Sequence, residues 1–237
     1  MNTSNLEDVY NRQTHSNQQF YDAYNTFVFS DDRRVFGKLL LRYDFFCKTK
    51  QLPGDIVEVG VFRGSGIAAW CKFVDLFIPH TCKTIIGFDM FNMPNKNLIL
   101  DNYSNGDIMK TVIKRVDDNS LDINYIKTVL EKANIKQEKY LLIEGDVSTT
   151  SSEFVKNNPG FRISLLYLDL DLDEPTFDTL CNLWDRVVPG GYVVFDEYEF
   201  HKFDESNGVD KFLKFKNIQY KVISTNFYAP TAYIIKE

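Results

Sequence analysis

Short apolar runs alternate with segments of helical periodicity along most of the chain, and this alternation constrains the fold most strongly. The runs expected to be strands are 56–60, 84–88, 140–144, 163–170 and 192–195. Between them lie segments expected to be helical, at 65–77, 121–133, 149–156 and 174–187. Such alternation is typical of an α/β domain with a parallel sheet covered on both faces. A closing pair of strands, 219–224 and 231–235, predicts an antiparallel edge.

Two further regions flank or interrupt this pattern. Residues 17–50 are expected to be helical, because apolar residues recur there at helical spacing after Ser30-Asp31-Asp32. Residues 92–119 form a long polar region with one predicted helix near 108–116, and a last helix is expected at 208–215. Long irregular segments in compact domains are often functional. We therefore divide the chain into an N-terminal helical lid, 1–50, and a main domain, 51–237.

Composition narrows the class of protein. The 237 residues, 44% apolar and 25% charged, suit one soluble domain, and the net charge of −6 argues against a nucleic-acid-binding surface. No apolar stretch approaches the roughly 20 residues of a membrane span, and the first residues lack a signal core, so we expect a cytoplasmic protein. The cysteines form no CxxC pair and are expected to be reduced, mostly buried thiols. They are Cys47, Cys71, Cys82 and Cys181.

Six carboxylates gather in two short stretches, 168–174 and 195–198, each after an apolar run. Side chains two apart on a strand share a face, so Asp169 and Asp171 would sit side by side if the strand continued that far. Crowded carboxylates repel, and burial makes each costly to ionise. A hard divalent cation relieves both problems, because oxygen ligands suit Mg²⁺ or Ca²⁺. The pattern therefore predicts a cation site.

A glycine-rich turn, DIVEVGVFRGSG at residues 55–66, joins the first predicted strand to its helix. Its glycine order, G-x-x-x-G-x-G, departs from the G-x-G-x-x-G fingerprint of dinucleotide binding. Glu58 precedes Gly60 by two residues, and E-x-G-x-x-x-G resembles the first motif of class I S-adenosylmethionine-dependent methyltransferases. A purely structural glycine turn is the alternative.

Two more acids follow the next two predicted strands. Asp89 ends the second strand and Asp146 follows the third. In open α/β sheets the ligand lies beyond the carboxyl ends of the strands. Asp89 could accept hydrogen bonds from ribose hydroxyls, and Asp146 could hold an adenine amino group. Together with Glu58, they favour a bound nucleoside over three unrelated solvated acids.

Four segments give the chain a closer resemblance. They are PGDIVEVGVFRG at 53–64, FDMFNMP at 88–94, LDLDLDEPT at 168–176 and PGGYVVFDEY at 189–198. With these segments the chain resembles, over about residues 29–212, the macrocin O-methyltransferase family of metal-dependent sugar methyltransferases. The resemblance implies a Rossmann-like class I methyltransferase fold. Its sheet would have seven mostly parallel strands, helices on both faces and an antiparallel edge.

The resemblance also implies roles for individual residues. Asp169, Asp196 and Glu197 match the metal-binding positions, with Mg²⁺ as the expected ion. Asp171 matches the proposed general base, and His201 is the second candidate because its ordinary pKa suits that role. The residues expected to contact the methyl donor, S-adenosylmethionine, are Glu58, Gly60, Arg63, Gly64, Ser65, Asp89, Asp146 and Asp169.

The chain departs from the family pattern at three points. It has Asp196-Glu197-Tyr198 where the family usually has Asp-Asp-Tyr, and Asp173 where the family has Tyr. Glu199-Phe200-His201 stands where the family often has Gly-x-Trp. Because that last region lies near the acceptor, we expect an acceptor different from the antibiotic sugars.

The predicted activity is S-adenosylmethionine- and Mg²⁺-dependent O-methylation of a sugar, a nucleotide sugar or a glycosylated metabolite. A catechol-type or other small-molecule O-methyltransferase is the nearest alternative. A nucleotide-dependent oxidoreductase and a non-catalytic interaction protein are more distant ones. Many such methyltransferases are dimers, so a homodimer is a further expectation.

Overall fold

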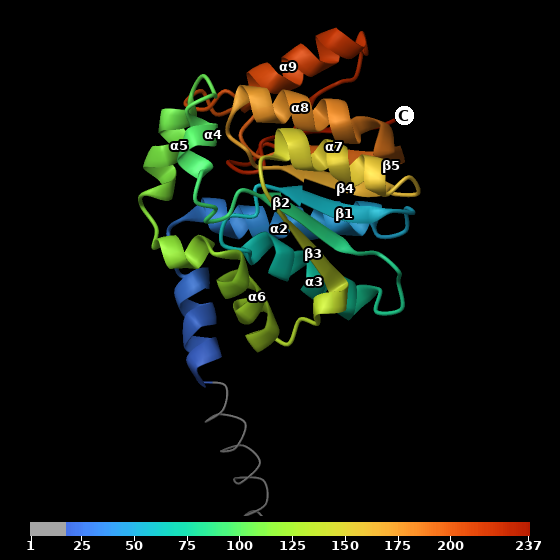
Figure 1. Ribbon diagram of the computed structural model, residues 1–237. Coiled ribbons are helices and arrows are strands. Elements are labelled where there is room, and N and C mark those ends of the chain that lie inside the picture. Colours follow the sequence, from blue (N-terminus) through green and yellow to red (C-terminus); the bar gives the residue numbers. More distant parts are fainter. Residues whose placement is uncertain (1–17) are drawn as a thin grey trace, which may run out of the picture.

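The computed structural model describes residues 18–237, and its centre is one mixed sheet (Figure 1). Within those residues the sheet has seven strands in the order β3-β2-β1-β4-β5-β7-β6. All neighbours are parallel except β7, which runs antiparallel to β5 and β6. The strands are β1 (Asp55–Val59), β2 (Ile85–Asp89), β3 (Tyr140–Glu144), β4 (Ile163–Leu168), β5 (Val187–Phe195), β6 (Ile223–Ser224) and β7 (Ala232–Ile235). The predicted parallel sheet with an antiparallel edge is therefore confirmed.

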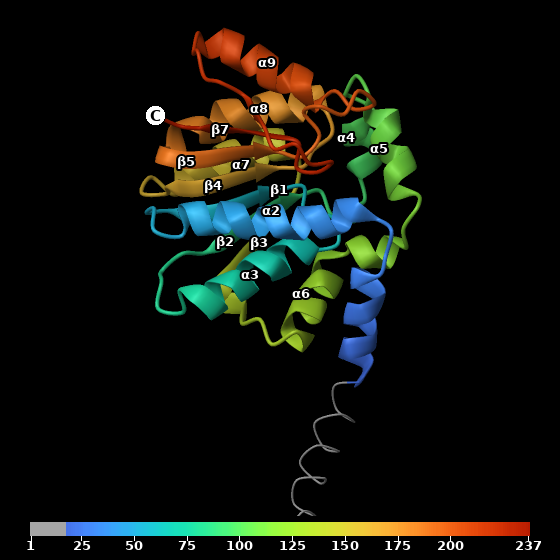
Figure 2. The ribbon, with the colours of Figure 1, turned by 180° about the vertical axis from the view of Figure 1, so that it is seen from behind.

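Helices cover both faces of this sheet (Figures 1 and 2). One face carries α2 (Arg33–Thr49), α3 (Ser65–Phe77) and α6 (Ile123–Lys132). The other face carries α7 (Val147–Asn157), α8 (Asp173–Leu183) and α9 (Glu205–Lys216). Short 3₁₀ turns are η1 (Asp118–Leu121), η2 (Gln137–Lys139) and η3 (Trp184–Arg186).

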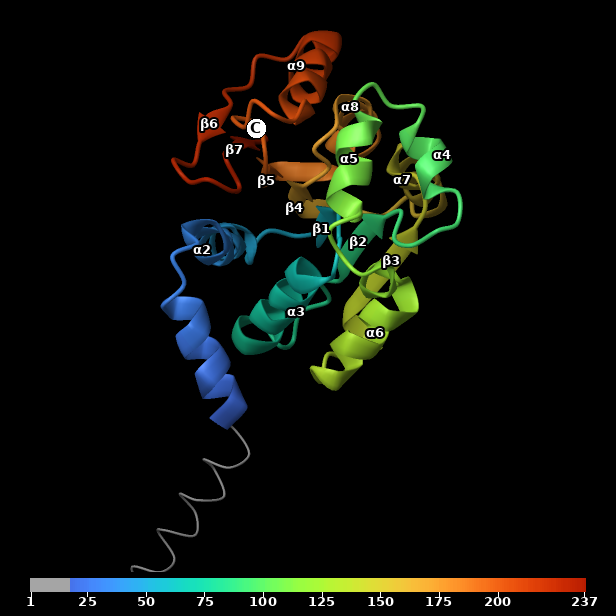
Figure 3. The same cartoon turned by 90° about the vertical axis from the view of Figure 1, so that its left-hand side faces the viewer.

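Two short helices lie beyond the carboxyl ends of the parallel strands. They are α4 (Lys96–Leu100) and α5 (Gly106–Ile113), which Figure 3 shows in front of the strand tips. The strand order reverses between β1 and β4, and ligands of open α/β sheets bind outside such a reversal. The fold thus places α4 and α5 where they can wall a ligand site.

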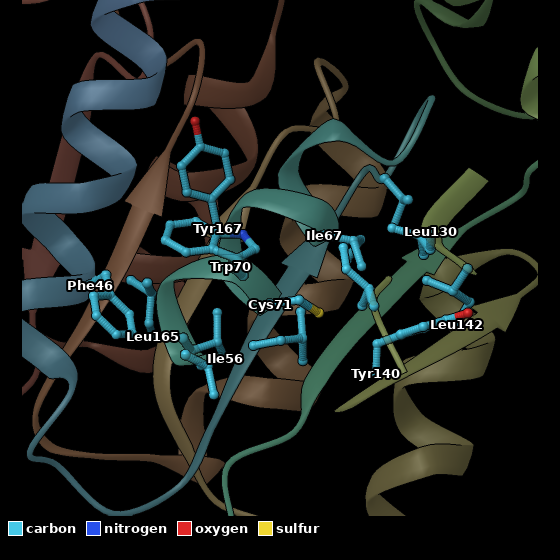
Figure 4. Close-up of a cluster of buried hydrophobic side chains, with 14 of the residues drawn as sticks. Phe46, Ile56, Ile67, Trp70, Cys71, Leu130, Tyr140, Leu142, Leu165 and Tyr167 are labelled. Atoms are coloured by element: carbon cyan, nitrogen blue, oxygen red, sulfur yellow. The ribbon is translucent and has the colours of Figure 1, made fainter. Parts of the chain in front are cut away.

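The helix α2 belongs to the core rather than to a loose cover. Asp32 begins it by accepting a hydrogen bond from the backbone N–H of Arg34, as a helix N-cap does. Phe45 and Phe46 on its inner face are buried against the sheet. Figure 4 shows Phe46 in the same cluster as Trp70 and Tyr167. Each such side chain contributes about 1.5–3 kcal/mol by leaving water, which holds this segment on the domain.

Three predicted strand limits were wrong by more than one residue, and one of them belongs to the strand expected at 219–224, which begins only at Ile223. The strand predicted at 163–170 ends at Leu168, because Asp171 adopts a left-handed backbone with φ of 63°. Asp169 and Asp171 therefore do not share one strand face. The sequence 189–191, expected to be a turn before the strand, lies inside β5, where Gly190 donates a backbone hydrogen bond to Lys236 at 2.6 Å.

Other differences are smaller. The polar region 92–119 contains α4, which was not predicted, and its expected helix begins earlier, at Gly106. The cysteines are free, as expected, but Cys71 alone is buried and Cys82 is exposed, so the expectation of mostly buried thiols was wrong. No helix within residues 18–237 is long and apolar enough to cross a membrane.

Candidate active site

Two adjoining pockets lie at the carboxyl ends of the central strands. The first has a volume of about 250 Å³ and contains Asp89, Asp146 and Asp171, with an apolar wall from α4 and α5. The second has about 300 Å³ and is lined by Glu58 and Ser65. Both pockets include Lys38, Gly60, Phe62 and Asp169. The fold thus gathers most of the predicted donor residues around one elongated space.

Gly60 marks the point where the two pockets meet. Its φ is 92°, and a Cβ there would lie 1.9 Å from the backbone oxygen of Asp169. Only glycine fits, because the chain leaving β1 passes directly against the chain leaving β4. The glycine turn is therefore required by packing as well as by ligand approach.

Glu58 forms a buried ion pair at the closed end of the second pocket. It is 1% exposed, and Oε1 accepts a hydrogen bond of 2.8 Å from Arg42 Nη2. Gly66 makes room for this carboxylate, since a Cβ there would lie 1.9 Å from Oε1. Burial raises the pKa of Glu58 to about 7, although the positive charge of Arg42 acts to lower it. Its Oε2 has no hydrogen-bond partner among the described residues, so a ligand donor could satisfy it.

Asp89 and Asp146 line the first pocket and also organise its walls. Asp89 accepts backbone hydrogen bonds from Phe62 at 2.8 Å and Phe91 at 2.7 Å, and burial raises its pKa. Asp146 begins α7 and accepts the Tyr103 hydroxyl at 2.7 Å. Each acid holds a loop that borders the pocket.

A lysine lies among the predicted metal ligands. Lys38 Nζ of α2 donates to Asp169 Oδ2 at 2.7 Å and to Asp196 Oδ2 at 2.8 Å. Asp196 is 1% exposed and also accepts a hydrogen bond from the Tyr167 hydroxyl. The two aspartates hold the pKa of Lys38 above its usual range, although burial opposes this. Sequence reasoning missed Lys38; the available signal was one lysine within the otherwise apolar stretch 35–41.

The other acids of this cluster differ in environment. Burial, and then the charge of Asp169, raises the pKa of Asp171 to about 8. Burial, and then Asp196, raises the pKa of Glu197 to about 7. Glu197 lines a neighbouring groove. The other two predicted metal ligands, Asp169 and Asp196, form ion pairs with Lys38. Across residues 18–237, no group of three or more His, Cys, Asp or Glu side chains is arranged to hold a metal.

Glu205, at the start of α9, is a second residue that sequence reasoning missed. It is fully buried and accepts backbone hydrogen bonds from Leu170 at 3.3 Å and Glu197 at 3.1 Å. Burial raises its pKa well above the usual range. It therefore ties together the loops that follow β4 and β5, which carry the acidic cluster.

Besides Asp196 and Glu197, three predicted residues lie outside both donor pockets. His201 is exposed and packs its ring near Phe200, with centroids 5.7 Å apart. Arg63 is exposed, and Gly64 begins α3 with φ of 83°. The structure thus brings Asp171, rather than His201, to the donor pocket.

The strand order and the pockets beyond the strand tips define a class I S-adenosylmethionine-dependent methyltransferase fold. The calicheamicin methyltransferase CalS11 has the same fold, with a TM-score of 0.69 and 24% identity, over 90% of this chain and 83% of that one. The family described as macrocin-O-methyltransferase (TylF) matches residues 46–229, and the chain belongs to this family. The family predicted from the resemblance over about residues 29–212 is therefore confirmed.

Two curated relatives are similar over shorter spans. An 8-demethyl-8-(2,3-dimethoxy-alpha-L-rhamnosyl)-tetracenomycin-C 4'-O-methyltransferase of Streptomyces olivaceus is 29% identical over 151 residues, 62% of this chain and 54% of the relative. The demethyldecarbamoylnovobiocin O-methyltransferase of Streptomyces niveus is 28% identical over 150 residues, 62% of this chain and 53% of the relative. The chain therefore matches about half the length of each.

Proposed function

We propose that this protein transfers the methyl group of S-adenosylmethionine to a hydroxyl of a sugar, a nucleotide sugar or a glycosylated metabolite, with Mg²⁺ as the metal. The observation that carries the proposal is the convergence of Asp169 and Asp196 on one cationic point beside the donor pockets. Membership of the macrocin O-methyltransferase family supports the reaction, and the names of both relatives describe O-methyltransferases.

The pockets suit the two ends of the methyl donor. The unpaired Oε2 of Glu58 is an acceptor for the donor's ammonium group, directly or through water. The first pocket, with Asp89 and Asp146, offers carboxylates for ribose and adenine and an apolar wall for the ring. The sulfonium would then lie near Gly60 and Asp169, which line both pockets.

In the proposed function, a divalent cation takes the place of the Lys38 ammonium in the acidic cluster. Asp169 and Asp196 each already aim one oxygen at a single point, and Glu197 is the third candidate oxygen ligand. A bound Mg²⁺ would lower the pKa of an acceptor hydroxyl held beside it. Lys38 would have to move aside, because it contacts both aspartates.

Asp171 is the proposed general base. Burial and the neighbouring acids raise its pKa to about 8, and a Mg²⁺ bound beside it would lower this pKa toward neutral, where the ionised carboxylate can accept a proton. The acceptor oxygen attacks the sulfonium methyl, its proton passes to Asp171, and the donor leaves as a neutral thioether. Alignment of the reacting atoms supplies much of the rate enhancement, up to about 7–11 kcal/mol in favourable cases.

Calorimetry with S-adenosylhomocysteine and with Mg²⁺ tests the proposal separately for donor and metal. Asp196→Asn should lose Mg²⁺ binding and methyl transfer while still binding S-adenosylhomocysteine. Lys38→Met removes the competing ammonium, so it should bind Mg²⁺ at least as tightly as the unchanged protein. Intact Mg²⁺ binding in Asp196→Asn would refute the ligand assignment. Acceptors are screened by mass spectrometry for the gain of one CH₂.

A further inference from the structure

A separate groove of about 1070 Å³ opens beside the acidic cluster. Glu197 lines it, and Val112 of α5 lines both this groove and the first donor pocket. The start of α2, the α5 side and the loop after β5 border it, all near the strand tips seen in Figure 3. An acceptor reaching the acidic cluster would therefore rest in this groove.

Four cationic side chains from three separate elements line the groove. They are Arg33 and Arg34 at the start of α2, Arg115 after α5, and Lys202 in the loop after β5. Arg34 is 3.6 Å from Asp32, but Arg33, Arg115 and Lys202 form no salt bridge with any side chain that the structure describes. Three acids, Asp31, Asp32 and Glu197, also line the groove, so its four cations exceed its acids by one. The whole chain has a net charge of −6, so the groove is more positive than the protein as a whole.

The start of α2 adds to the attraction for an anion. A helix N-terminus is positive, and acidic residues usually stabilise it. Here the first turn holds no acid and begins with Arg33 and Arg34. Asp32 already caps this end by accepting a hydrogen bond from the Arg34 N–H, and Arg33 and Arg34 add two positive charges beside the groove.

Aromatic side chains line the same groove. Tyr228 is 72% exposed, and the rings of Phe200 and Phe203 lie 5.4 Å apart. Exposed aromatic faces stack on nucleobases, and guanidinium groups bind phosphates in bidentate fashion. A neutral glycoside could accept hydrogen bonds from the arginines but would leave their positive charge uncompensated.

We propose that this groove binds the nucleoside diphosphate of a nucleotide-linked sugar, so that the acceptor is methylated before its sugar is transferred to any carrier. Arg33, Arg115 and Lys202 would hold the diphosphate, and Tyr228 would stack on the base. The sugar would then reach toward Glu197 and the acidic cluster. This inference rests on the proposed function and names its substrate class.

Binding of UDP, dTDP and GDP, with inorganic pyrophosphate and glucuronate for comparison, tests the groove by calorimetry without added divalent cation. The nucleoside diphosphates should bind more tightly than pyrophosphate. Arg33→Ala/Arg115→Ala should weaken all the phosphates by about tenfold or more, since charge-assisted hydrogen bonds are lost. Tyr228→Ala should remove the advantage of the nucleotides over pyrophosphate. Lys132→Ala, an exposed lysine of α6 away from the groove, should change nothing.

S-adenosylhomocysteine, titrated into every variant, separates this inference from the proposed function. Its affinity should stay unchanged, because the substituted residues line neither donor pocket. If it binds while no phosphate binds, or if the double variant binds phosphates normally, the groove assignment is wrong and the methyltransferase proposal stands. Binding of glucuronate without pyrophosphate would also overturn it, in favour of a carboxylated acceptor. Failure of S-adenosylhomocysteine to bind the unchanged protein would instead refute the proposed function.

Discussion

Asp171 combines two properties that bear on its proposed role. Its backbone is left-handed, a conformation that Asn and Asp adopt more readily than other non-glycine residues. Its side chain lines the donor pocket, where burial and neighbouring acids raise its pKa to about 8. Asparagine therefore preserves both shape and backbone while removing the proton acceptor.

We expect Asp171→Asn to fold normally, to bind S-adenosylhomocysteine, and to lose about 10²–10⁴-fold in turnover, the usual contribution of a general base. Single-turnover transfer and thermal unfolding measure the two effects. His201→Ala is the matched comparison and should retain its turnover, because His201 lines neither donor pocket. The opposite result, with Asp171→Asn active and His201→Ala inactive, would place the base on His201.

The Arg42–Glu58 pair gives a pH-dependent prediction. Arg42 also lies 4.9 Å from the Tyr167 ring centroid, so the guanidinium is held on both sides. Arg42→Met leaves Glu58 buried without its partner, which costs about 3–5 kcal/mol of unfolding free energy when Glu58 is charged. The destabilisation should be large at pH 8 and small at pH 5.5, as measured by urea unfolding.

The sign follows from the raised pKa. Glu58 titrates at about 7 in the folded protein, above its ordinary value of 4.5, so protonation favours the folded state. Stability from this group is fully present below about pH 4.5 and is lost as pH rises through 7. Without Arg42 the folded pKa rises further, and the protonated form persists at pH 5.5. A pH-independent loss would show that packing, rather than charge, dominates.

At the scale of elements, the close crossing of the β1–α3 turn and the end of β4 shapes the site. Gly60→Ala should cost about 2–4 kcal/mol, from a left-handed backbone and a clash with the Asp169 carbonyl. It should also abolish S-adenosylhomocysteine binding in calorimetry. Gly160→Ala is the control, because nothing lies within 4 Å of its added Cβ. If the two variants were equally stable and bound S-adenosylhomocysteine equally well, the crossing would not be rigid.

The sequence pattern located elements better than it located their ends. β3 and α3 match their predicted limits, because apolar periodicity and turn residues agree there. β4 was predicted too long, since the Leu-Asp alternation of 168–172 continues a strand pattern while the backbone turns at Asp171. The spacing of apolar residues shows which face of an element a side chain lies on, but it does not predict the backbone φ angle at which the element ends.

The candidate site was predictable where one motif carries its chemistry. Asp89, Asp146 and Asp169 line the first pocket, as expected, because each lies at or just after the tip of a strand that faces it. Lys38 was not predicted, because it reaches Asp169 across 131 residues of chain and no local motif records such a contact. Apart from Glu197, the residues that line the groove were missed for the same reason.

At the scale of the whole molecule, the N-terminal helices carry a band of exposed apolar side chains. Residues 18–28 form a helix that projects from the body (Figures 1 and 2). Phe29, beyond its end, is 84% exposed, and Phe20 and Tyr24 are exposed on the helix. Large exposed apolar patches usually mark interfaces.

We therefore expect a homodimer formed through this band. Light scattering after size exclusion should give twice the chain mass, and Phe20→Ser/Phe29→Ser should give the single mass. Leu76→Ser, at an exposed leucine on α3, is the control and should leave the dimer intact. A monomeric unchanged protein would contradict the prediction.

The position of Lys38 has a consequence for the coupling between metal and acceptor binding. The lysine forms ion pairs with two aspartates that the proposed function assigns to the metal. It lies on the same helix as Arg33, five residues away, and Arg33 borders the groove. In the proposed function, a metal bound by Asp169 and Asp196 would displace Lys38 from both carboxylates. Because Lys38 and Arg33 lie on the same helix, we expect metal binding to change the affinity of the groove for its acceptor.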